Sequence, residues 1–355
     1  VDTVLVRFED QQPEIVSSLC VAYPEPLAER LRQMIGRHLR PSDDEMLLMD
    51  HELAEFFALS AWGLLDHTGL KAKDILAIGS HGQTVWHNPV KPKPETIQLG
   101  DPQHIANLTG IPTVSRFRQA DLQAGGQGAP LAPLLHGALF KPEKGVCAVL
   151  NLGGIANISV LDHNGTISGY DTGPGNCLLD HWVRKHKGTD FDDGGQWAAG
   201  GNVDETLLDL LLADPYFALP PPKSTGVEYF NYYWLRSRLD GRRPDAVQAS
   251  LRDIQTTLSE LTARTSAEAV KSASAEELLV CGGGSHNHDV LKRLQRLLPD
   301  TRVNTTAIRG MDPDLVEGVL FAWLARERIA GRAQDTRRIT GAREAVLLGE
   351  IFDPV

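Results

Sequence analysis

A single carboxylate set between glycine turns is the feature of this sequence best suited to chemistry. In the stretch AVLNLGGIANISVLDHNGTISGYDTGPGN, residues 148–176, an apolar run enters the pair Gly153–Gly154. A second run delivers Asp171 into a loop that contains Gly173 and Gly175. Glycine turns after strands let backbone N–H groups surround an anion, and an acidic residue beside them can remove a proton or hold a metal. The pattern predicts a phosphate site next to a reacting hydroxyl or water, with a turn-capping role for Asp171 as the alternative.

A polar segment follows another short apolar run, which ends at Gly79. The segment SHGQT, Ser80 to Thr84, gathers polar side chains around one glycine and includes His81 and Gln83. Polar side chains at the end of a strand predict a shelf for a polar substrate. A purely structural histidine is the alternative at position 81.

Two arginines and one glutamate are weaker candidates. Arg116 and Arg118 flank Phe117 and would point the same way if the segment were extended. A guanidinium group suits a carboxylate or phosphate, but surface salt bridges explain the pair equally well. Glu317 stands at a predicted helix start, where acidic residues usually interact with the helix dipole.

Two loops complete the set of candidates. The triple glycine Gly282–Gly284 follows an apolar run and predicts close backbone approach to a flat ligand such as adenine or ribose; a plain turn is the alternative. It matches neither the dinucleotide-binding nor the Walker A fingerprint. The segment Lys223–Gly226 lies in a long irregular region and predicts either a mobile lid or a solvated turn.

The totals restrict the class of protein. With 355 residues, two domains are the default, and 42% hydrophobic and 23% charged residues are typical of globular proteins. The net charge of -11 argues against nucleic acid or an anionic membrane as partner. No cysteine or histidine spacing suits zinc, so no metal ligands are predicted. Four dispersed cysteines indicate a reducing, cytoplasmic location.

Strands and helices are predicted to alternate, which defines an α/β class. Strands are expected within 1–22, 75–78 and 278–284, and helices over 43–69, 204–214, 251–270, 289–298 and 313–330. Glycine breaks follow apolar strands at Gly79, Gly153 and Gly282. Because ligands collect where the strands of α/β sheets end, the pattern predicts a nucleotide in a cleft between two domains.

As a set, these segments resemble the anhydro-N-acetylmuramic acid kinase family, of the superfamily that includes actin and hexokinase. The resemblance covers essentially the whole chain. It rests on eight motifs in order: IGSHGQTVWH (78–87), TIQLGD (96–101), AGGQGAPL (124–131), NLGGIANIS (151–159), GYDTGPGN (169–176), PKSTGVEYFN (222–231), VCGGGSHN (280–287) and EGVLFAW (317–323).

The resemblance implies an activity. It implies ATP-dependent phosphorylation of 1,6-anhydro-N-acetylmuramic acid, with ring opening by water, to give N-acetylmuramic acid 6-phosphate in peptidoglycan recycling. It assigns the general base to Asp171, which would take a proton from the attacking water. It further implies substrate contacts from His81, Gln83, Arg116 and Glu317. Nucleotide contacts are implied for Asp2, Asn151, Gly153, Gly154, Gly173, Gly175, Asn176, Gly282, Gly283, Gly284 and Asn287.

Three positions depart from the family pattern. The resemblance implies that a first phosphate loop precedes Val1 and that Val1 and Asp2 are its last two residues, so the chain as given would bind ATP weakly. The basic run after Phe117 continues here as Gln119–Ala120, and the lid has Val227 where the family usually has arginine. Both changes weaken the predicted anion contacts there.

The resemblance also implies a fold and partners. The expected fold is an α/β, two-domain actin-like ATPase (ribonuclease H-like) fold with an interdomain cleft. The first domain would comprise 1–120 with about 335–355, and the second 121–334. Expected partners are ATP with Mg²⁺, the anhydro-sugar and a second copy in a homodimer. Another sugar or acetate kinase of the superfamily, or a non-catalytic nucleotide- or sugar-binding relative, is the alternative.

Overall fold

The computed structural model describes residues 1–9, 12–36, 39–88, 94–240 and 249–355. Its contacts divide the chain into two compact units. Unit 1 comprises Val1–Leu135 with Leu315–Val355, and unit 2 comprises His136–Asp314. The functional domains expected from the sequence, 1–120 with about 335–355 and 121–334, stay a prediction. Helix α13 (Val316–Ile329) lies in unit 1, whereas that division places it in the second domain.

Unit 2 is built on a five-stranded sheet of order β11-β10-β7-β8-β9. Its strands are β7 (Val146–Leu152), β8 (Ile155–Asp162), β9 (Ile167–Pro174), β10 (Glu277–Cys281) and β11 (Arg302–Thr305). Strands β7, β8 and β9 form an antiparallel meander, and β10 is parallel to both β7 and β11. This order and these directions are those of a ribonuclease H-like sheet, and the α/β class is confirmed.

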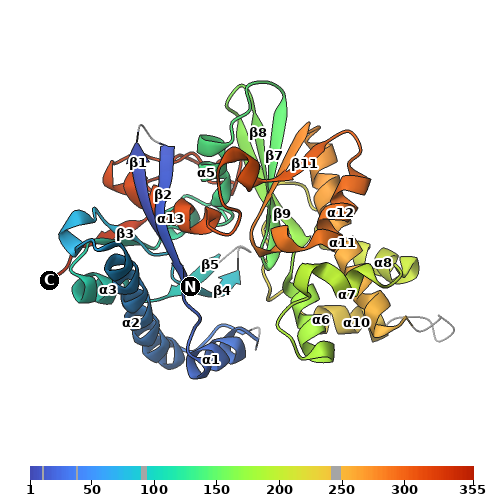
Figure 1. Ribbon diagram of the computed structural model, residues 1–355, viewed down its shortest axis with the longest axis horizontal. Helices are drawn as coiled ribbons and strands as arrows, with labels where there is room; N and C mark the ends of the chain where they lie inside the picture. Colours follow the sequence, from blue (N-terminus) through green and yellow to red (C-terminus); the bar gives the residue numbers. More distant parts are fainter. Residues whose placement is uncertain (10–11, 37–38, 89–93, 241–248) are drawn as a thin grey trace. The chain divides into compact units, whose positions relative to one another are not determined.

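Helices pack against this sheet, with α11 and α12 beside it in Figure 1. The helices of unit 2 are α6 (Cys177–Lys187), α7 (Gln196–Ala199), α8 (Glu205–Leu212), α9 (Pro215–Ala218), α10 (Tyr232–Asp240), α11 (Leu251–Ser272) and α12 (His288–Leu297). Helix α11 begins with a capping box made by Ser250 and Asp253. Buried apolar residues of these helices and of the sheet form one core.

Unit 1 holds three small sheets. The strands are β1 (Asp2–Glu9) with β2 (Gln12–Cys20), β4 (Gln83–Asn88) with β5 (Glu95–Leu99), and β3 (Ile78–Gly79), β6 (Thr113–Ser115) and β12 (Glu350–Phe352) in the order β12-β6-β3. Its helices are α1 (Glu25–Gly36), α2 (Asp43–Thr68), α3 (Pro102–Thr109), α4 (Gln119–Gln123) and α13. Helix α5 (Ala132–Leu139) spans the unit boundary.

Most elements match their predicted bounds. Helix α2 starts where the acidic residues predict it, because Ser42 and Glu45 form a capping box. The strand expected over 75–78 is wrong for residues 75–77: the strand is Ile78–Gly79, and a 3-10 turn at 72–74 precedes it. The polar turn expected at 9–12 lies partly outside the described residues.

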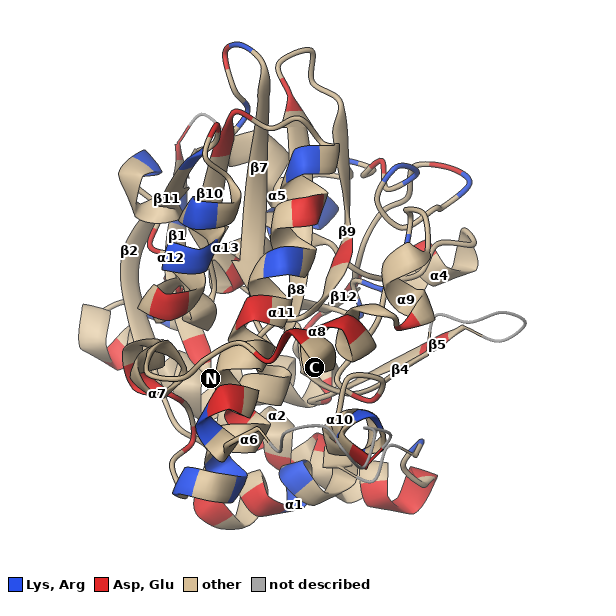
Figure 2. Ribbon diagram, turned by 90° about the vertical axis from the view of Figure 1, so that its right-hand side faces the viewer, with Lys and Arg blue, Asp and Glu red and all other residues tan. Residues whose placement is uncertain are grey.

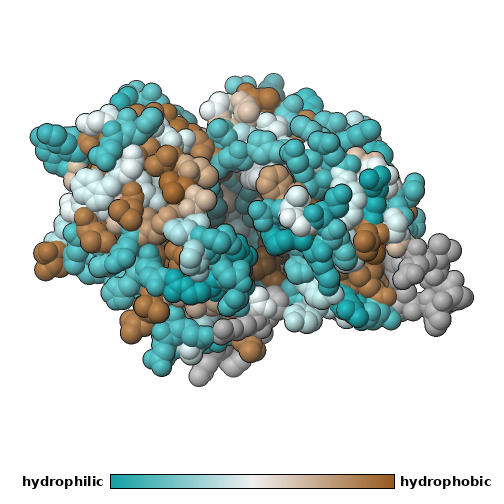
Figure 3. Space-filling model, turned by 60° about the horizontal axis from the view of Figure 1, so that its bottom comes forward, coloured by the Kyte–Doolittle hydropathy of each residue, from teal (hydrophilic) through white to brown (hydrophobic). Residues whose placement is uncertain are grey.

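The surface is polar and mixed in charge. Acidic and basic residues are interspersed along the helices seen in Figure 2, so the negative net charge is not concentrated on one of them. Figure 3 shows apolar side chains scattered among polar ones on the face it draws. None of the helices in the described ranges has the length and apolar character needed to span a membrane.

Candidate active site

Asp171 lies on β9, and the loop that follows α9 holds it in place. Its side chain is almost buried, and Oδ2 accepts a hydrogen bond from the backbone N–H of Thr225 at 2.9 Å. The Asp171 backbone is also fixed, because its N–H donates to the Lys223 carbonyl and its carbonyl accepts the Tyr216 hydroxyl at 2.6 Å. The carboxylate is therefore oriented by tertiary contacts, as a general base requires.

The loop that supplies Thr225 rests on a cluster of aromatic rings. Phe230 is 1% exposed and contacts the rings of Tyr216, Phe217 and Trp234 at centroid distances of 5.1 to 5.6 Å. Such rings contribute much of the burial in a core. The segment 222–231 is therefore anchored at its C-terminal end.

A buried cation lies beside the carboxylate. Lys223 is 8% exposed, and its Nζ donates to the carbonyls of Tyr216 and Phe217 and lies 4.7 Å from the centroid of the Tyr216 ring. Burial lowers the pKa of Lys223, and the charge of Asp171 partly opposes that shift. Since Lys223 is buried, the segment Lys223–Gly226 is not the solvated turn that the sequence allowed.

Three glycine turns meet at one edge of the unit 2 sheet. Strands β7 and β10 are parallel neighbours, so the turns at Gly153–Gly154 and Gly282–Gly284 lie side by side at their carboxyl ends. The turn after β9 joins them, because the N–H of Gly175 donates to the Gly154 carbonyl. Asn176 donates from its backbone to Gly153 and from its side chain to Leu152. These predicted nucleotide residues are thus brought together.

This edge has the open backbone that a nucleotide requires. A Cβ added to Gly283 would meet no atom within 4 Å, and one added to Gly153 would meet none closer than 3.5 Å. In addition, the Ser285 hydroxyl is buried and has no hydrogen-bond partner among the residues that the structure describes. Bare backbone beside an unsatisfied hydroxyl fits a polar ligand such as a nucleotide.

Other predicted nucleotide residues have packing roles. A Cβ on Gly173 would lie 2.7 Å from the Phe217 ring, so this glycine is required by the aromatic cluster. Asn287 caps α12 by accepting the N–H of Val290. Asn151 contacts Gly282, whose added Cβ would lie 2.3 Å from its Oδ1. The contact of Gly173 and Asn287 with a nucleotide stays a prediction.

Two adjacent glycines offer a test of the nucleotide edge. We expect Gly283→Ala to weaken ATP binding about tenfold, a loss of about 1.4 kcal/mol, because its methyl group would enter the open space that the ligand needs. The thermal midpoint should hardly change. Gly284→Ala should instead lower the midpoint, since its Cβ would lie 2.5 Å from Leu152. Calorimetric ATP titration and thermal melts check both; unchanged affinity in Gly283→Ala would contradict the assignment.

In unit 1, His81, Arg118 and Glu317 form a second group of polar residues. Arg118 donates to His81 Nε2 at 2.9 Å and to the Gly128 carbonyl at 2.8 Å. Burial and the charge of Arg118 lower the pKa of His81 to about 3, so the ring is neutral near pH 7. Because Arg118 can only donate, the proton of His81 is placed on Nδ1.

Glu317 faces Arg118 and Asp2 across this group. Desolvation by surrounding protein atoms raises the pKa of Glu317. The positive charge of Arg118 opposes this shift, and the negative charge of Asp2 adds to it. The Glu317 side chain also keeps solvent-exposed surface. The prediction that Asp2 closes a first phosphate loop stays a prediction.

The structure does not place Arg116 with these residues. Arg116 has φ 55, so the segment is not extended, and the condition under which Arg116 and Arg118 would point the same way is not met. Arg116 pairs instead with Glu350 at 3.1 Å and lies over the Phe352 ring. Gln83 is engaged too, since its Oε1 accepts the Tyr23 hydroxyl.

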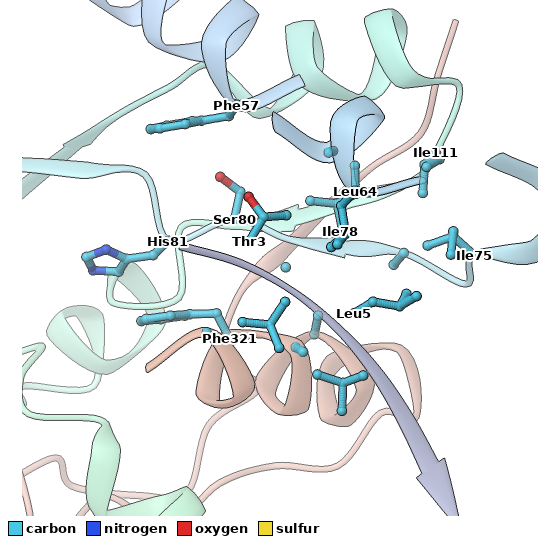
Figure 4. A pocket seen from close by; sticks show the side chains of 18 of the residues that line it. Thr3, Leu5, Phe57, Leu64, Ile75, Ile78, Ser80, His81, Ile111 and Phe321 are labelled. Carbon is cyan, nitrogen blue, oxygen red and sulfur yellow. The ribbon is translucent and has the colours of Figure 1, made fainter. Parts of the chain in front are cut away.

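An apolar cavity of about 940 Å³ adjoins this group within unit 1. Its walls come from β1, β3, α2 and α13, and Figure 4 shows Leu5, Ile78 and Phe321 among the side chains that line it. His81 stacks on Phe321 at 4.4 Å between ring centroids. The polar residues Asp2, His81 and Glu317 also border this cavity.

No metal centre is apparent in the ranges that the structure describes. Within them, no three His, Cys, Asp or Glu side chains are arranged to hold an ion.

Glycine turns and an oriented carboxylate within one unit are typical of an α/β phosphotransferase. The family model for anhydro-N-acetylmuramic acid kinase matches residues 1–354, and the chain belongs to this family. Two relatives of that name are 44% identical to it. The protein from Vibrio cholerae matches over 100% of this chain and 95% of its own length. The one from Xanthomonas axonopodis pv. citri matches over 99% and 94%.

A third relative matches about as well as these two, and a solved structure matches more weakly. The anhydro-N-acetylmuramic acid kinase of Haemophilus influenzae is 43% identical over 99% of this chain and 94% of its own. Among solved structures, the activator of the 2-hydroxyisocaproyl-CoA dehydratase from Clostridium difficile with bound ADPNP gives a TM-score of 0.41 at 13% identity. That match covers 78% of this chain and 84% of the activator, a similarity too low to support a functional statement.

The site contains residues that the sequence did not single out. Glu228 lies two positions after Gly226 inside the quoted motif PKSTGVEYFN, which was the available signal. The sequence marks Arg118 as a candidate for binding a carboxylate or phosphate, but does not distinguish it from Arg116. Asp214 and Tyr216, which hold the Asp171 loop, carry no local signal because their partners are distant in sequence.

Proposed function

We propose that this protein uses ATP to phosphorylate 1,6-anhydro-N-acetylmuramic acid and opens its anhydro ring with water, giving N-acetylmuramic acid 6-phosphate. Family membership supports the substrate and the phosphotransferase class. The observation that carries the mechanism is the Asp171 carboxylate, which is almost buried and oriented by the Thr225 N–H. Such a group can act on one water molecule without a second protein acid.

The reaction balances with Asp171 as the only proton acceptor. Water attacks the anomeric carbon while Asp171 takes one of its protons, and the bond from that carbon to O6 breaks. The departing O6 forms a bond to the γ-phosphorus, and ADP leaves. In inverting glycoside hydrolysis an acid protonates the leaving oxygen; here phosphoryl transfer replaces that proton. Mg²⁺, when bound, would offset charge on the transferring phosphates.

The two groups of residues receive separate roles. We assign the nucleotide to the turns at Gly153–Gly154, Gly175–Asn176 and Gly282–Gly284, and the open backbone at Gly153 and Gly283 supports this assignment. We assign the sugar to His81 and Glu317, with Arg118 holding His81 neutral and oriented. The roles of Gln83 and Arg116 are supported by resemblance alone, because both side chains already have protein partners.

Isotope labelling tests the function. In ¹⁸O-water with ATP and the anhydro-sugar, we expect one ¹⁸O in the product at the anomeric hydroxyl and none in its phosphate group. Mass spectrometry of the sugar 6-phosphate locates the label. Phosphorylation of ordinary hexoses or of acetate, with the anhydro-sugar unreacted, would favour the other sugar or acetate kinase of the superfamily; binding without turnover would favour a non-catalytic relative.

We also propose a homodimer and a cytoplasmic location. Exposed apolar side chains on α2, namely Leu47, Leu48, Leu59 and Trp62, support a protein–protein contact there. The four cysteines, all within the described ranges, form no disulfide, which is typical of a reducing compartment. Light scattering on the purified protein measures the oligomeric state directly.

A further inference from the structure

The segment Thr225–Glu228 folds into a tight turn beside Asp171. The N–H groups of Tyr229 and Phe230 both donate to the Gly226 carbonyl, at 3.0 and 3.2 Å. The Glu228 side chain folds back over this turn, since a Cβ on Gly226 would lie 2.1 and 2.2 Å from its two carboxyl oxygens. The absence of a side chain at Gly226 leaves room for this arrangement, which places the Glu228 carboxyl group beside the residue that follows Thr225, the donor to Asp171.

The groups around Glu228 are mostly acidic or neutral. Asp171 on β9 interacts with it electrostatically, as does the Cys177 thiol at the start of α6. Lys223 lies in the same loop but is directed at the carbonyls of Tyr216 and Phe217. In the part of the chain that the structure describes, Glu228 makes no ion pair with a basic side chain.

Position 227, next to Glu228, also supplies no positive charge. Val227 packs towards the nucleotide turn, where a Cβ on Gly154 would lie 3.4 Å from its Cγ1. A basic residue at this position would offset the charge of an ionised Glu228, and valine cannot. Glu228 and Asp171 therefore form a pair of nearby carboxyl groups without a basic side chain assigned to Glu228.

We propose that Glu228 is a positioning residue that acts through Asp171, as a second carboxyl group whose charge sets the strength of Asp171 as a base. The inference rests on the proposed function, in which Asp171 accepts a proton from water. When Asp171 accepts that proton, its charge changes from minus one to zero. A negative charge on Glu228 favours this change, because it disfavours the ionised form of its neighbour.

The charge of Glu228 changes within the working range of pH. Burial, assisted by the charge of Asp171, raises the pKa of Glu228 to about 7. Below that pH the side chain is neutral and Asp171 is the weaker base; above it, Asp171 is the stronger base. For the unmodified protein, kcat at saturating substrates should therefore rise about threefold through pH 7, as expected for a base strengthened by a fraction of a pKa unit.

Glu228→Gln tests the proposal. Glutamine keeps the size and neutrality of the protonated acid, so kcat should stay at the low-pH level of the unmodified protein and the rise should vanish. Glu228→Asp should restore a rise in part. The matched control is Glu205→Gln, which removes an exposed carboxylate of the same unit and should keep the full rise. Thermal melts establish that each variant folds.

Two outcomes separate failure of this inference from failure of the proposed function. A Glu228→Gln profile that still rises through pH 7 would overturn the inference, whereas turnover of ordinary hexoses or acetate with the anhydro-sugar unreacted would overturn the proposed function itself. A direct titration needs no turnover: the ¹³C carboxyl resonance of Glu228 should titrate at lower pH in Asp171→Asn than in the unmodified protein. An unchanged midpoint would also refute the pairing of the two groups.

Discussion

Asp171→Asn is expected to lower kcat about 10³-fold, within the range that general base catalysis contributes. An amide cannot accept the proton of the attacking water. Its carbonyl oxygen can still accept the Thr225 N–H, so the loop and the glycine turns should keep their structure. ATP affinity should accordingly change by less than about threefold, which is under 1 kcal/mol. Steady-state kinetics and calorimetric ATP titration measure the two effects separately.

The control for this variant is Asp209→Asn, which neutralises an exposed carboxylate on α8 in the same unit. Its kcat and ATP affinity should match those of the unmodified protein. If Asp171→Asn kept more than a tenth of kcat, another group would have to activate the water. If it lost ATP affinity in proportion to kcat, Asp171 would be a nucleotide contact and not the base.

The meeting of the glycine turns at one edge of the sheet could be predicted from the sequence, because that geometry follows from local rules; their contact with a nucleotide stays a prediction. Glycines that follow buried strands can be found by inspection, and parallel pairing places the ends of β7 and β10 at the same edge. The start of α2 was predictable for the same reason, since Ser42 and Glu45 are three residues apart. In each case the partners are near in sequence or related by a regular element.

The sequence could not predict features that depend on distant partners. In an extended segment, alternating side chains would place Arg116 and Arg118 on the same face, but the positive φ of Arg116 shows that the segment is not extended. Arg116 forms an ion pair with Glu350 instead. Helix α11 has one predicted apolar stripe, yet Gln255, Ser259 and Glu260 on other faces are buried as well. Surrounding helices cover those faces, and Ser259 and Glu260 find hydrogen-bonding partners on α12. The spacing of apolar residues along α11 cannot predict such partners.

The loop that orients Asp171 depends on one buried acid, Asp214. Its side chain accepts hydrogen bonds from the Tyr216 N–H, the Tyr229 hydroxyl and the Trp234 indole, at 2.8 to 2.9 Å. It also forms an ion pair with Arg238 at 2.6 Å, in which the Asp214 carboxyl is fully buried. Because Tyr216 and Tyr229 flank the loop 222–228, this acid joins the aromatic cluster to the loop that orients the Asp171 carboxylate.

Asp214→Ala should lower the free energy of unfolding by about 3 kcal/mol, because it leaves buried donors and a partly buried arginine unpaired. For a domain of this size the thermal midpoint should fall by roughly 6–12 °C. Asp209→Ala, the exposed control on α8, should change it by less than about 2 °C. The same loss of anchoring should let the Thr225 N–H move away from Asp171, so kcat should fall before the protein unfolds. Differential scanning calorimetry, with kinetics well below the transition, measures both; a variant that lost stability but kept full kcat would show that the loop is held without Asp214.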